Sequence, residues 1–303
     1  MQSLPPGTEP TVGIVTVLYN SKAVLGDFLK SLEAQGDMHF RLYAVNNSPT
    51  KDDLRIVERW MQDKQIQGAA IQSEGNVGVA AGNNRGVALA LADGCDYILL
   101  ANNDTVFGEG VVRLLLNSSR GRSADVVSAK IYYHEAPDTI WYVYGKFNAW
   151  LMRVPHLGIN QRDSFKYTKT RISEYAPTCF LLVRAGVFGE IGWMDERYFC
   201  YYDDTDFMWR LRKRGIGVLT ETSAVVLHKV SSSTGGDGSD FSIYYLNRNR
   251  IYFIRKNLEG LKRWVALAYV LASRVPKIIL LSPEKRRILL SALRDGLSMV
   301  VVR

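Results

Sequence analysis

The sequence predicts an α/β protein built around a parallel sheet. Between residues 11 and 101, short apolar runs alternate with segments of helical periodicity, an order typical of βαβ units. The apolar runs are continuous, as expected for strands that are covered on both faces. The chain has 303 residues, of which 47% are apolar, so it is long enough for one large domain or two small ones and disorder is not expected.

The first half of the chain contains four predicted strands and the helices between them. The strands are expected at 11–17, 40–45, 69–72 and 97–101, and the helices at 23–36, 54–61, 87–92 and 108–117. Sheets of this kind bind ligands beyond the carboxyl ends of their strands. We therefore expect a binding site at the turns near Tyr19, at Asn46 and after Gln72.

The turn after the third strand is rich in glycine and asparagine. Residues 76–86 read NVGVAAGNNRG and lead into the predicted helix. Glycines permit close approach of the backbone, and helix N-termini attract anions. The glycine spacing matches neither a Rossmann fingerprint nor a P-loop. The segment indicates either a phosphate or nucleotide site or a tight connection between strand and helix.

Two further positions suit a metal ion. Asn102, Asn103 and Asp104 follow the fourth strand directly, and oxygen ligands at a strand end can bind a hard divalent cation. Asp and Asn are also common in ordinary turns. His228 ends the apolar run 224–227, which is a suitable place for a metal ligand or for a structural histidine.

The second half of the chain is less regular. Strands are expected at 125–129, 176–183, 217–219 and 224–227, and short helices at 187–191 and 207–213. The aromatic-rich stretch 132–175 is interpreted as an excursion with short strands of its own that partly covers the site. Residues 231–239 are rich in glycine and serine and are predicted to form a lid.

Three carboxylates, Asp203, Asp204 and Asp206, stand within four positions, before a segment of helical pattern. Each disfavours ionisation of the next, so the cluster favours a site that holds a metal, orients a sugar or takes a proton. The alternative is an acidic first turn of a helix, which the helix dipole stabilises. Arg210 lies four residues after Asp206, and on a helix this spacing makes the two side chains neighbours.

The last third of the chain is helical in pattern and carries much of the net charge of +8. An aromatic-basic stripe is interpreted as a solvated helix face: Tyr244, Tyr245, Arg248, Asn249, Tyr252 and Arg255. Further along, apolar residues stand beside Arg and Lys. Such helices suit the surface of an anionic membrane. The alternatives are packing on the catalytic part of the chain and a homodimer contact.

The compartment is predicted from absent signals. No apolar run of 18 residues and no signal peptide is found, and Cys95, Cys179 and Cys200 have no metal-ligand spacing. We expect reduced thiols in a cytoplasmic protein that is at most peripheral on the cytoplasmic face of the inner membrane.

Several of these motifs together resemble family 2 glycosyltransferases with a GT-A fold, in particular the rhamnosyltransferase-like branch. The resemblance runs from about Val12 to Asn257. It is carried, in order, by TVLYN at 16–20, VNNS at 45–48, residues 76–86, NND at 102–104, GWMDERYF at 192–199 followed by YDDTD at 202–206, and HK at 228–229. Three positions depart from the family pattern: Asn46 and Asn102 replace aspartates, and Asp203 replaces a glutamate.

The resemblance implies a GT-A catalytic domain at 1–240, a mixed sheet flanked by helices, and a C-terminal helical extension at 241–303. It implies an inverting hexosyltransferase that uses a nucleotide-diphosphate sugar, with dTDP-rhamnose as the favoured donor and a glycan or polyprenyl-linked glycan of a bacterial surface polysaccharide as acceptor.

The resemblance also assigns residues. Asp104 and His228, with Asn102, would bind Mg²⁺ or Mn²⁺, and Asp204 would be the catalytic base. Asp203 and Asp206 are the rival candidates for the base. If they are not the base, they and Arg210 would support the site or contact the acceptor. The donor would be bound by Thr16, Tyr19, Asn46, Asn76, Gly78, Asn83 and Asn103, and Gly78 and Gly82 would permit its close approach.

Three alternatives remain open from the sequence. The donor sugar is galactofuranose, glucose or N-acetylglucosamine instead of rhamnose. The chain is a degenerate, non-catalytic carbohydrate- or nucleotide-binding module, which Asn46 and Asn102 favour. A nucleic-acid-binding protein is the third, but it has only the positive charge in its favour, since the chain lacks a recognition motif; no nucleic-acid partner is expected.

Overall fold

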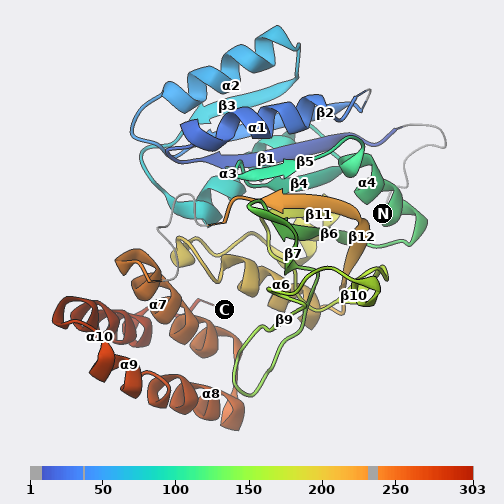
Figure 1. Ribbon diagram of the computed structural model, residues 1–303. Helices are drawn as coiled ribbons and strands as arrows, with labels where there is room; N and C mark the ends of the chain where they lie inside the picture. The colour runs from blue at the N-terminus through green and yellow to red at the C-terminus, as the bar shows by residue number, and fades with distance from the viewer. Residues whose placement is uncertain (1–8, 37, 231–237, 303) are drawn as a thin grey trace.

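The computed structural model describes residues 9–36, 38–230 and 238–302. In this part of the chain, a ten-stranded mixed sheet has the order β10-β12-β6-β11-β4-β1-β2-β3, with β5 on β12 and β7 on β6. The sheet crosses the body of the molecule, and the C-terminal helices gather below it (Figure 1).

The first half is the parallel part that the sequence predicts. Its strands are β1 (Val12–Leu18), β2 (Phe40–Asn46), β3 (Gly68–Gln72) and β4 (Tyr97–Ala101), and its helices are α1 (Lys22–Glu33), α2 (Asp52–Asp63) and α3 (Gly78–Ala92). β1 pairs in parallel with β2 and β4, and β2 with β3. The carboxyl ends of these strands therefore share one edge, where ligands of such sheets bind.

The second half adds antiparallel pairs. Its elements are β5 (Thr105–Phe107), α4 (Val111–Gly121), β6 (Val126–Tyr133), β11 (Phe180–Arg184), α5 (Gly186–Ile191), η2 (Glu196–Tyr198), α6 (Asp203–Lys213) and β12 (Val218–His228). β11 runs antiparallel to β4, with Phe180 opposite Ala101. β5 runs antiparallel to the end of β12, with Thr105 opposite His228.

The excursion between β6 and β11 has short strands of its own, as predicted. They are β7 (Ala136–Tyr142), β8 (Tyr144–Gly145), β9 (His156–Leu157) and β10 (Arg171–Ser173), with a 3-10 turn, η1 (Phe165–Tyr167). β8 pairs with β9, and an isolated bridge joins Gly145 to Tyr175. The excursion is thereby anchored beside the start of β11.

Two element predictions are wrong. α3 begins at Gly78, so most of the glycine-rich segment is helix. Its glycines are needed because α3 lies against β1: a Cβ at Gly82 would lie 2.8 Å from Val17, and one at Gly86 would lie 2.4 Å from Val15. This close packing outweighs the low helix propensity of glycine. The two strands expected at 217–219 and 224–227 are one strand, β12, with a register shift between Glu221 and Val225.

The C-terminal helices are α7 (Asp240–Asn257), α8 (Gly260–Ala272), α9 (Val275–Leu280) and α10 (Pro283–Ser298). α7 is not a solvated helix face, because Asn249, Tyr252 and Ile254 are fully buried and the last two belong to the main hydrophobic core. Within the described residues, none of the helices is both long and apolar enough to cross a membrane. The cysteines are unpaired, and Cys95 and Cys179 are buried.

Candidate active site

Polar side chains predicted to bind the donor lie at the carboxyl ends of β1 and β2. Tyr19 is 37% exposed after β1. Thr16 is buried, and its Oγ1 has no hydrogen-bond partner among the described residues. Asn46 is fully buried, and its Nδ2 donates to Thr50 O and to Gln72 Oε1, both at 2.8 Å. In this conformation Asn46 orders its own turn.

Asn103 joins this edge from β4. Its Nδ2 donates to the carbonyl of Val17 at 2.7 Å and to Ser21 Oγ at 2.9 Å. The backbone N–H of Ser21 donates to the carboxylate of Asp53 at 2.7 Å. The amide of Asn103 thus fixes the end of β1 and the start of α1, and Asp53 is a member of this network that the sequence analysis missed.

The two main predicted metal ligands lie side by side. Nε2 of His228 is 3.2 Å from Oδ1 of Asp104, and both side chains are mostly buried. The β5–β12 pairing brings them together, and Lys229 N donates to the carbonyl of Asp104 at 2.9 Å. Asn102, which is partly exposed, is anchored through its N–H to Cys179 O at 2.8 Å.

This donor set fits a divalent cation that is only partly bound by protein. A carboxylate, an imidazole and an amide oxygen suit Mn²⁺ or Mg²⁺, which complete their coordination with phosphate oxygens and water. The Nδ1 atom of His228 is buried without a partner among the described residues. The rings of Trp141 and His228 pack in a T-shaped arrangement, with their centres 4.7 Å apart. No cluster of three or more His, Cys, Asp or Glu is found in the described part of the chain, so a complete protein cage is not built there.

The turn before α6 has an unusual backbone. Phe199, Tyr201 and Tyr202 all have φ between 65° and 67°, a left-handed conformation that is costly for aromatic residues. Asn249 on α7 stabilises it, because its Nδ2 lies 2.8–2.9 Å from the carbonyls of Tyr198, Cys200 and Tyr201. α7 therefore holds the acidic cluster in place.

Asp203 and Asp204 form the first turn of α6 and have different surroundings. Asp203 is 4% exposed; burial, followed by the charge of Asp204, raises its pKa to about 8. Asp204 is partly exposed, and Thr205 donates its backbone N–H and its hydroxyl to Oδ1 at 2.5 Å and 3.1 Å. Tyr175, from the excursion, donates its hydroxyl to Oδ2 at 2.5 Å.

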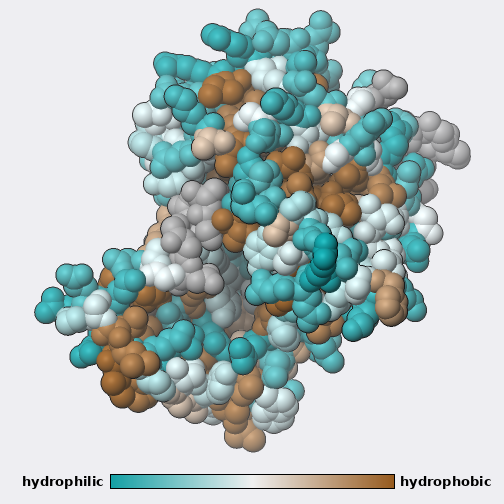
Figure 2. Space-filling view, in the orientation of Figure 1, coloured by the Kyte–Doolittle hydropathy of each residue, from teal (hydrophilic) through white to brown (hydrophobic). Residues whose placement is uncertain are grey.

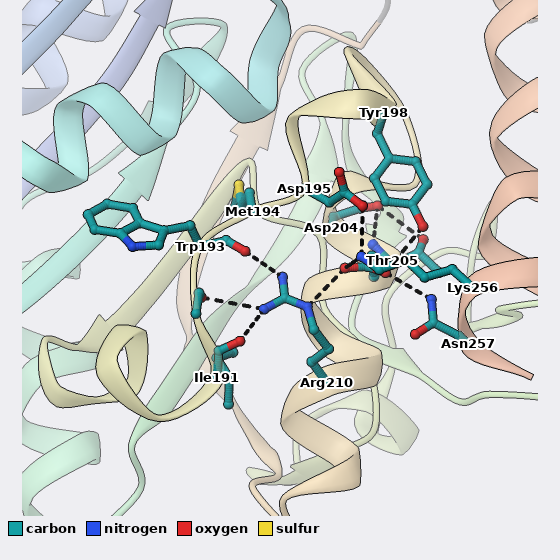
Figure 3. Close-up of polar contacts among 12 residues, drawn as sticks. Ile191, Trp193, Met194, Asp195, Tyr198, Asp204, Thr205, Arg210, Lys256 and Asn257 are labelled. Atoms are coloured by element: carbon teal, nitrogen blue, oxygen red, sulfur yellow. Dashed lines mark hydrogen bonds and ion pairs between the residues drawn. The ribbon is translucent and has the colours of Figure 1, made fainter. Parts of the chain in front are cut away.

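Asp206 belongs to a buried network, in which Tyr198 and Asn257 donate to its Oδ1 at 3.2 Å and 2.8 Å (Figure 3). The predicted pairing with Arg210 is confirmed at 2.9 Å, and Lys256 lies 2.9 Å from the same carboxylate. Arg210 also donates to the carbonyls of Ile191 and Trp193, at 2.5 Å and 2.9 Å. Asp206 has no exposed surface, so its carboxylate is enclosed by this buried network.

Asp195 is the second carboxylate of this network. Lys256 donates to it at 2.8 Å and Arg197 at 2.7 Å. Burial alone would raise the pKa of Asp195, but these two cations and the hydroxyl of Tyr252 outweigh burial and lower it. The network of ion pairs therefore joins α6, α7 and the 192–197 loop.

The glycine-asparagine segment, which forms the start of α3, packs against the turn before α6. Gly78 has φ +85°, and a Cβ there would lie 2.4 Å from the carbonyl of Phe199, which accepts a hydrogen bond from Val79 N at 2.6 Å. The close approach predicted for a donor is thus made by the protein itself, and the same holds for Gly82 and Val17.

The asparagines around Gly82 face other parts of the protein or solvent. Asn84 exchanges hydrogen bonds with the backbone of Met194 at 2.9 Å and 3.0 Å. Asn83 is buried beside the sulfur of Met194. Asn76 is exposed at the mouth of the turn.

Sequence reasoning missed Tyr175, His156, Asn249 and Lys256 as members of the site. Neither Tyr175 nor His156 stands in a recognisable pattern, because the excursion has no clear periodicity. Asn249 and Lys256 did carry a signal: they are polar residues seven positions apart, which places them on one face of the predicted helix. The predicted lid at 231–239 lies almost wholly outside the described residues.

A mixed sheet of this order, with acids at the end of β4 and at the start of α6, is the GT-A architecture of nucleotide-sugar transferases. The model of Glycosyl transferase family 2 matches residues 13–191, more than half of the chain, and the chain belongs to this family.

One curated relative and two solved structures illustrate the similarity. The chain is 31% identical over 153 residues to N-acetylglucosaminyl-diphospho-decaprenol L-rhamnosyltransferase of Mycobacterium tuberculosis, a match that covers 47% of this chain and 50% of that protein. It superimposes on GalNAc-T7 with UDP, GalNAc and Mn²⁺ (TM-score 0.67, 12% identity, 96% of this chain and 56% of that one). It also superimposes on the mannosyltransferase PcManGT from Pyrobaculum calidifontis with GDP-Man and Mn²⁺ (TM-score 0.59, 11% identity, 97% and 88%). These structural likenesses show the fold.

Proposed function

We propose that this chain is an inverting, metal-dependent glycosyltransferase that moves a sugar from a nucleotide-diphosphate donor to a hydroxyl of a glycan or lipid-linked glycan. The observation that carries the proposal is that two chemical groups, the Asp104–His228 pair and the carboxylate of Asp204, lie close to the same buried thiol. Burial raises the pKa of the Cys179 thiol, and the negative charges of Asp104 and Asp204 both raise it further, so both carboxylates lie within electrostatic reach of Cys179.

The proposed chemistry assigns a role to Asp204 and another to the Asp104–His228 pair. Asp204 accepts the proton of the acceptor hydroxyl, and the oxygen of that hydroxyl bonds to the anomeric carbon from the side opposite the diphosphate. This attack inverts the configuration. The bond between the anomeric carbon and the diphosphate breaks, and its electrons leave with the diphosphate. A base so placed contributes about 10²–10⁴ in rate. A cation bound by Asp104, His228 and Asn102 would supply stabilisation of the charge on the leaving diphosphate.

The surrounding residues have supporting roles in this proposal. Thr16, Tyr19 and Asn76 line the donor side, while Asn46, Asn83 and Asn103 keep its turns in place. Asp203, Asp206 and Arg210 hold α6 so that Asp204 faces the acceptor. The catalytic part is taken as 1–240 together with the buried face of α7, and the rest of 241–303 as an extension.

L-Rhamnose from dTDP-rhamnose is the donor we propose, because a relative at 31% identity is named an L-rhamnosyltransferase. A thermal-shift screen tests it with dTDP-rhamnose, UDP-galactose, UDP-glucose, UDP-N-acetylglucosamine and GDP-mannose, each with Mn²⁺ and with EDTA. A ligand that binds the folded state raises its apparent stability as RT ln(1 + [L]/Kd). A shift with dTDP-rhamnose that requires Mn²⁺ supports the proposal, and a shift with another donor alone replaces rhamnose by that sugar.

We also propose that the outer face of α8 and α9 contacts an anionic membrane surface. Trp264, Ile279 and Leu280 are 67%, 69% and 84% exposed, and Lys262 and Lys277 are exposed beside them. Figure 2 shows hydrophobic residues on the rim of this C-terminal lobe. Sedimentation with vesicles tests it. Binding to vesicles containing phosphatidylglycerol, lost in the double variant Trp264→Ser/Leu280→Ser, supports the contact. Equal sedimentation of that variant contradicts it, and a salt-insensitive dimer would favour a second copy of the chain.

A further inference from the structure

The excursion contributes a side chain to the acidic cluster. Tyr175 stands just before β11, and its hydroxyl donates to Oδ2 of Asp204 at 2.5 Å. Burial, followed by the charge of Asp204, holds the pKa of Tyr175 well above its usual range, so the phenol is a permanent donor. Asp204 therefore has a neutral donor on Oδ2 and the N–H and hydroxyl of Thr205 on Oδ1.

The ring of Tyr175 is held firmly in this position. His156 stacks on it with ring centres 5.3 Å apart, and the edge of Phe147 meets it at 6.1 Å. The backbone carbonyl of Tyr175 accepts hydrogen bonds from the hydroxyls of Tyr142 at 2.6 Å and Ser173 at 2.9 Å. A Cβ at Gly145 would lie 2.6 Å from the ring, so the excursion has a glycine where the phenol needs space.

Acids and neutral donors stand close to Asp204. Burial lowers the pKa of His156, so its imidazole is neutral. Further acids and neutral donors that interact with Asp204 are Asp203 on α6, Tyr175 and Cys179 before β11, and Cys200 and Tyr202 in the turn before α6. The guanidinium groups of Arg250 and Arg274 act on Tyr202, but they donate to Leu151 O and Asn247 Oδ1. Hydrogen bonds to the carboxylates therefore decide which acid of the adjacent pair is the anion.

We propose that Tyr175 is a positioning residue that makes Asp204, and not Asp203, the ionised carboxylate that faces the acceptor. This inference rests on the proposed function for its catalytic meaning, but the hydrogen bond itself does not depend on it. The phenol stabilises the carboxylate form of Asp204 and fixes its plane, while the buried Asp203 keeps the proton of the pair. The base thus combines a carboxylate on α6 with a hydrogen-bond donor from the excursion.

The test is the variant Tyr175→Phe, which removes one oxygen and keeps the ring against His156 and Phe147. The carboxyl carbons of ¹³C-labelled aspartates are titrated by NMR, with the signal of Asp204 assigned by Asp204→Asn. We expect Asp204 to titrate at least about one pH unit higher in Tyr175→Phe than in the wild type, since loss of a donor to the charged form raises an acid's pKa. The acidic limb of kcat/KM is expected to move up by a similar amount, while the donor-induced thermal shift stays the same.

The matched control is Tyr144→Phe. Tyr144 is buried in the same excursion, but its hydroxyl donates to the carbonyl of Lys169 at 2.6 Å. This variant should leave the titration of Asp204 and the acidic limb unchanged. If Asp204 titrates at the same pH in Tyr175→Phe as in the wild type, the inference is overturned. The titration needs no turnover, so failure of the wild type to transfer any sugar counts against the proposed function alone.

Discussion

The ammonium group of Lys256, near the end of α7, lies 2.9 Å from the fully buried carboxylate of Asp206 on α6. The same ammonium reaches Asp195 at 2.8 Å. One cation therefore joins the acidic helix, the loop before it and the first C-terminal helix. The extension that begins at 241 is tied to the acidic cluster through this contact.

Replacement of Lys256 by Met is expected to destabilise the protein strongly. It leaves two buried carboxylates with fewer compensating charges, and removal of one partner of a buried ion pair costs about 3–5 kcal/mol. Arg210 and Arg197 remain, so we expect the lower end of this range, measured as the free energy of unfolding in urea. Lys64→Met, at an exposed pair with Glu33, is the control and should change stability by less than about 1 kcal/mol. Equal effects of the two variants would show that Asp206 and Asp195 do not need Lys256.

Gly78→Ala is expected to be far more costly than Gly94→Ala. Both glycines have positive φ, +85° and +74°, so both substitutions carry a backbone cost of about 1 kcal/mol. A Cβ at Gly94 meets nothing within 4 Å, whereas one at Gly78 would lie 2.4 Å from Phe199 O. Unfolding in urea should give a loss of about 3 kcal/mol or more for Gly78→Ala. A loss equal to that of Gly94→Ala would mean that the Phe199 turn relaxes freely.

Asp104→Ala is expected to abolish the effect of Mn²⁺ on donor binding. Asp104 is the one carboxylate of the proposed metal site, and the neutral ligands that remain bind hard cations weakly. The thermal shift caused by the donor should become equal in Mn²⁺ and in EDTA. If Mn²⁺ still increases that shift in the variant, the assignment of Asp104 is wrong. Asp125→Ala, at an ion pair with Arg184, serves as a control for loss of an acid elsewhere.

Asp204→Asn is expected to lower turnover by at least about 10² and to leave donor binding intact. The amide cannot take the proton of the acceptor, while its size and most of its hydrogen bonds are retained. Transfer rates and the donor-induced thermal shift are measured on the same preparation. Activity close to that of the wild type would remove Asp204 as the base.

The raised pKa of Asp203 predicts how the free energy of unfolding depends on pH. Its pKa rises from an ordinary 3.8 to about 8 in the folded state, so between these values the folded protein holds a proton that the unfolded chain releases. Stability must then fall as pH rises through this window, by at most about 1.4 kcal/mol per unit. Urea midpoints at about pH 6 and about pH 8 should decline in the wild type and decline less in Asp203→Asn. An identical slope in the variant would contradict the burial of this proton.

The sequence predicted the first half of the fold well because apolar runs and helical periodicity there are local signals. It predicted the pairs Asp206–Arg210 and Asp104–His228 for different reasons, helix spacing in one case and family resemblance in the other. For the glycines of α3 the sequence left open a ligand site and a tight connection, because a close approach leaves the same pattern whether its partner is a nucleotide or Phe199. Tyr175 was missed because its role depends on a contact 29 positions away, within a stretch that has no periodicity.

The antiparallel register of β4 and β11, with Ala101 opposite Phe180, has a consequence for how this lineage can diverge. Asn102 and Cys179 are joined directly beyond that pair. The span between the end of β4 and the excursion is thus set by a backbone ladder, whose spacing does not respond to changes of side chain. Changes in the width of the candidate site are therefore expected in the excursion, where insertions leave the ladder untouched, and the two strands should change least.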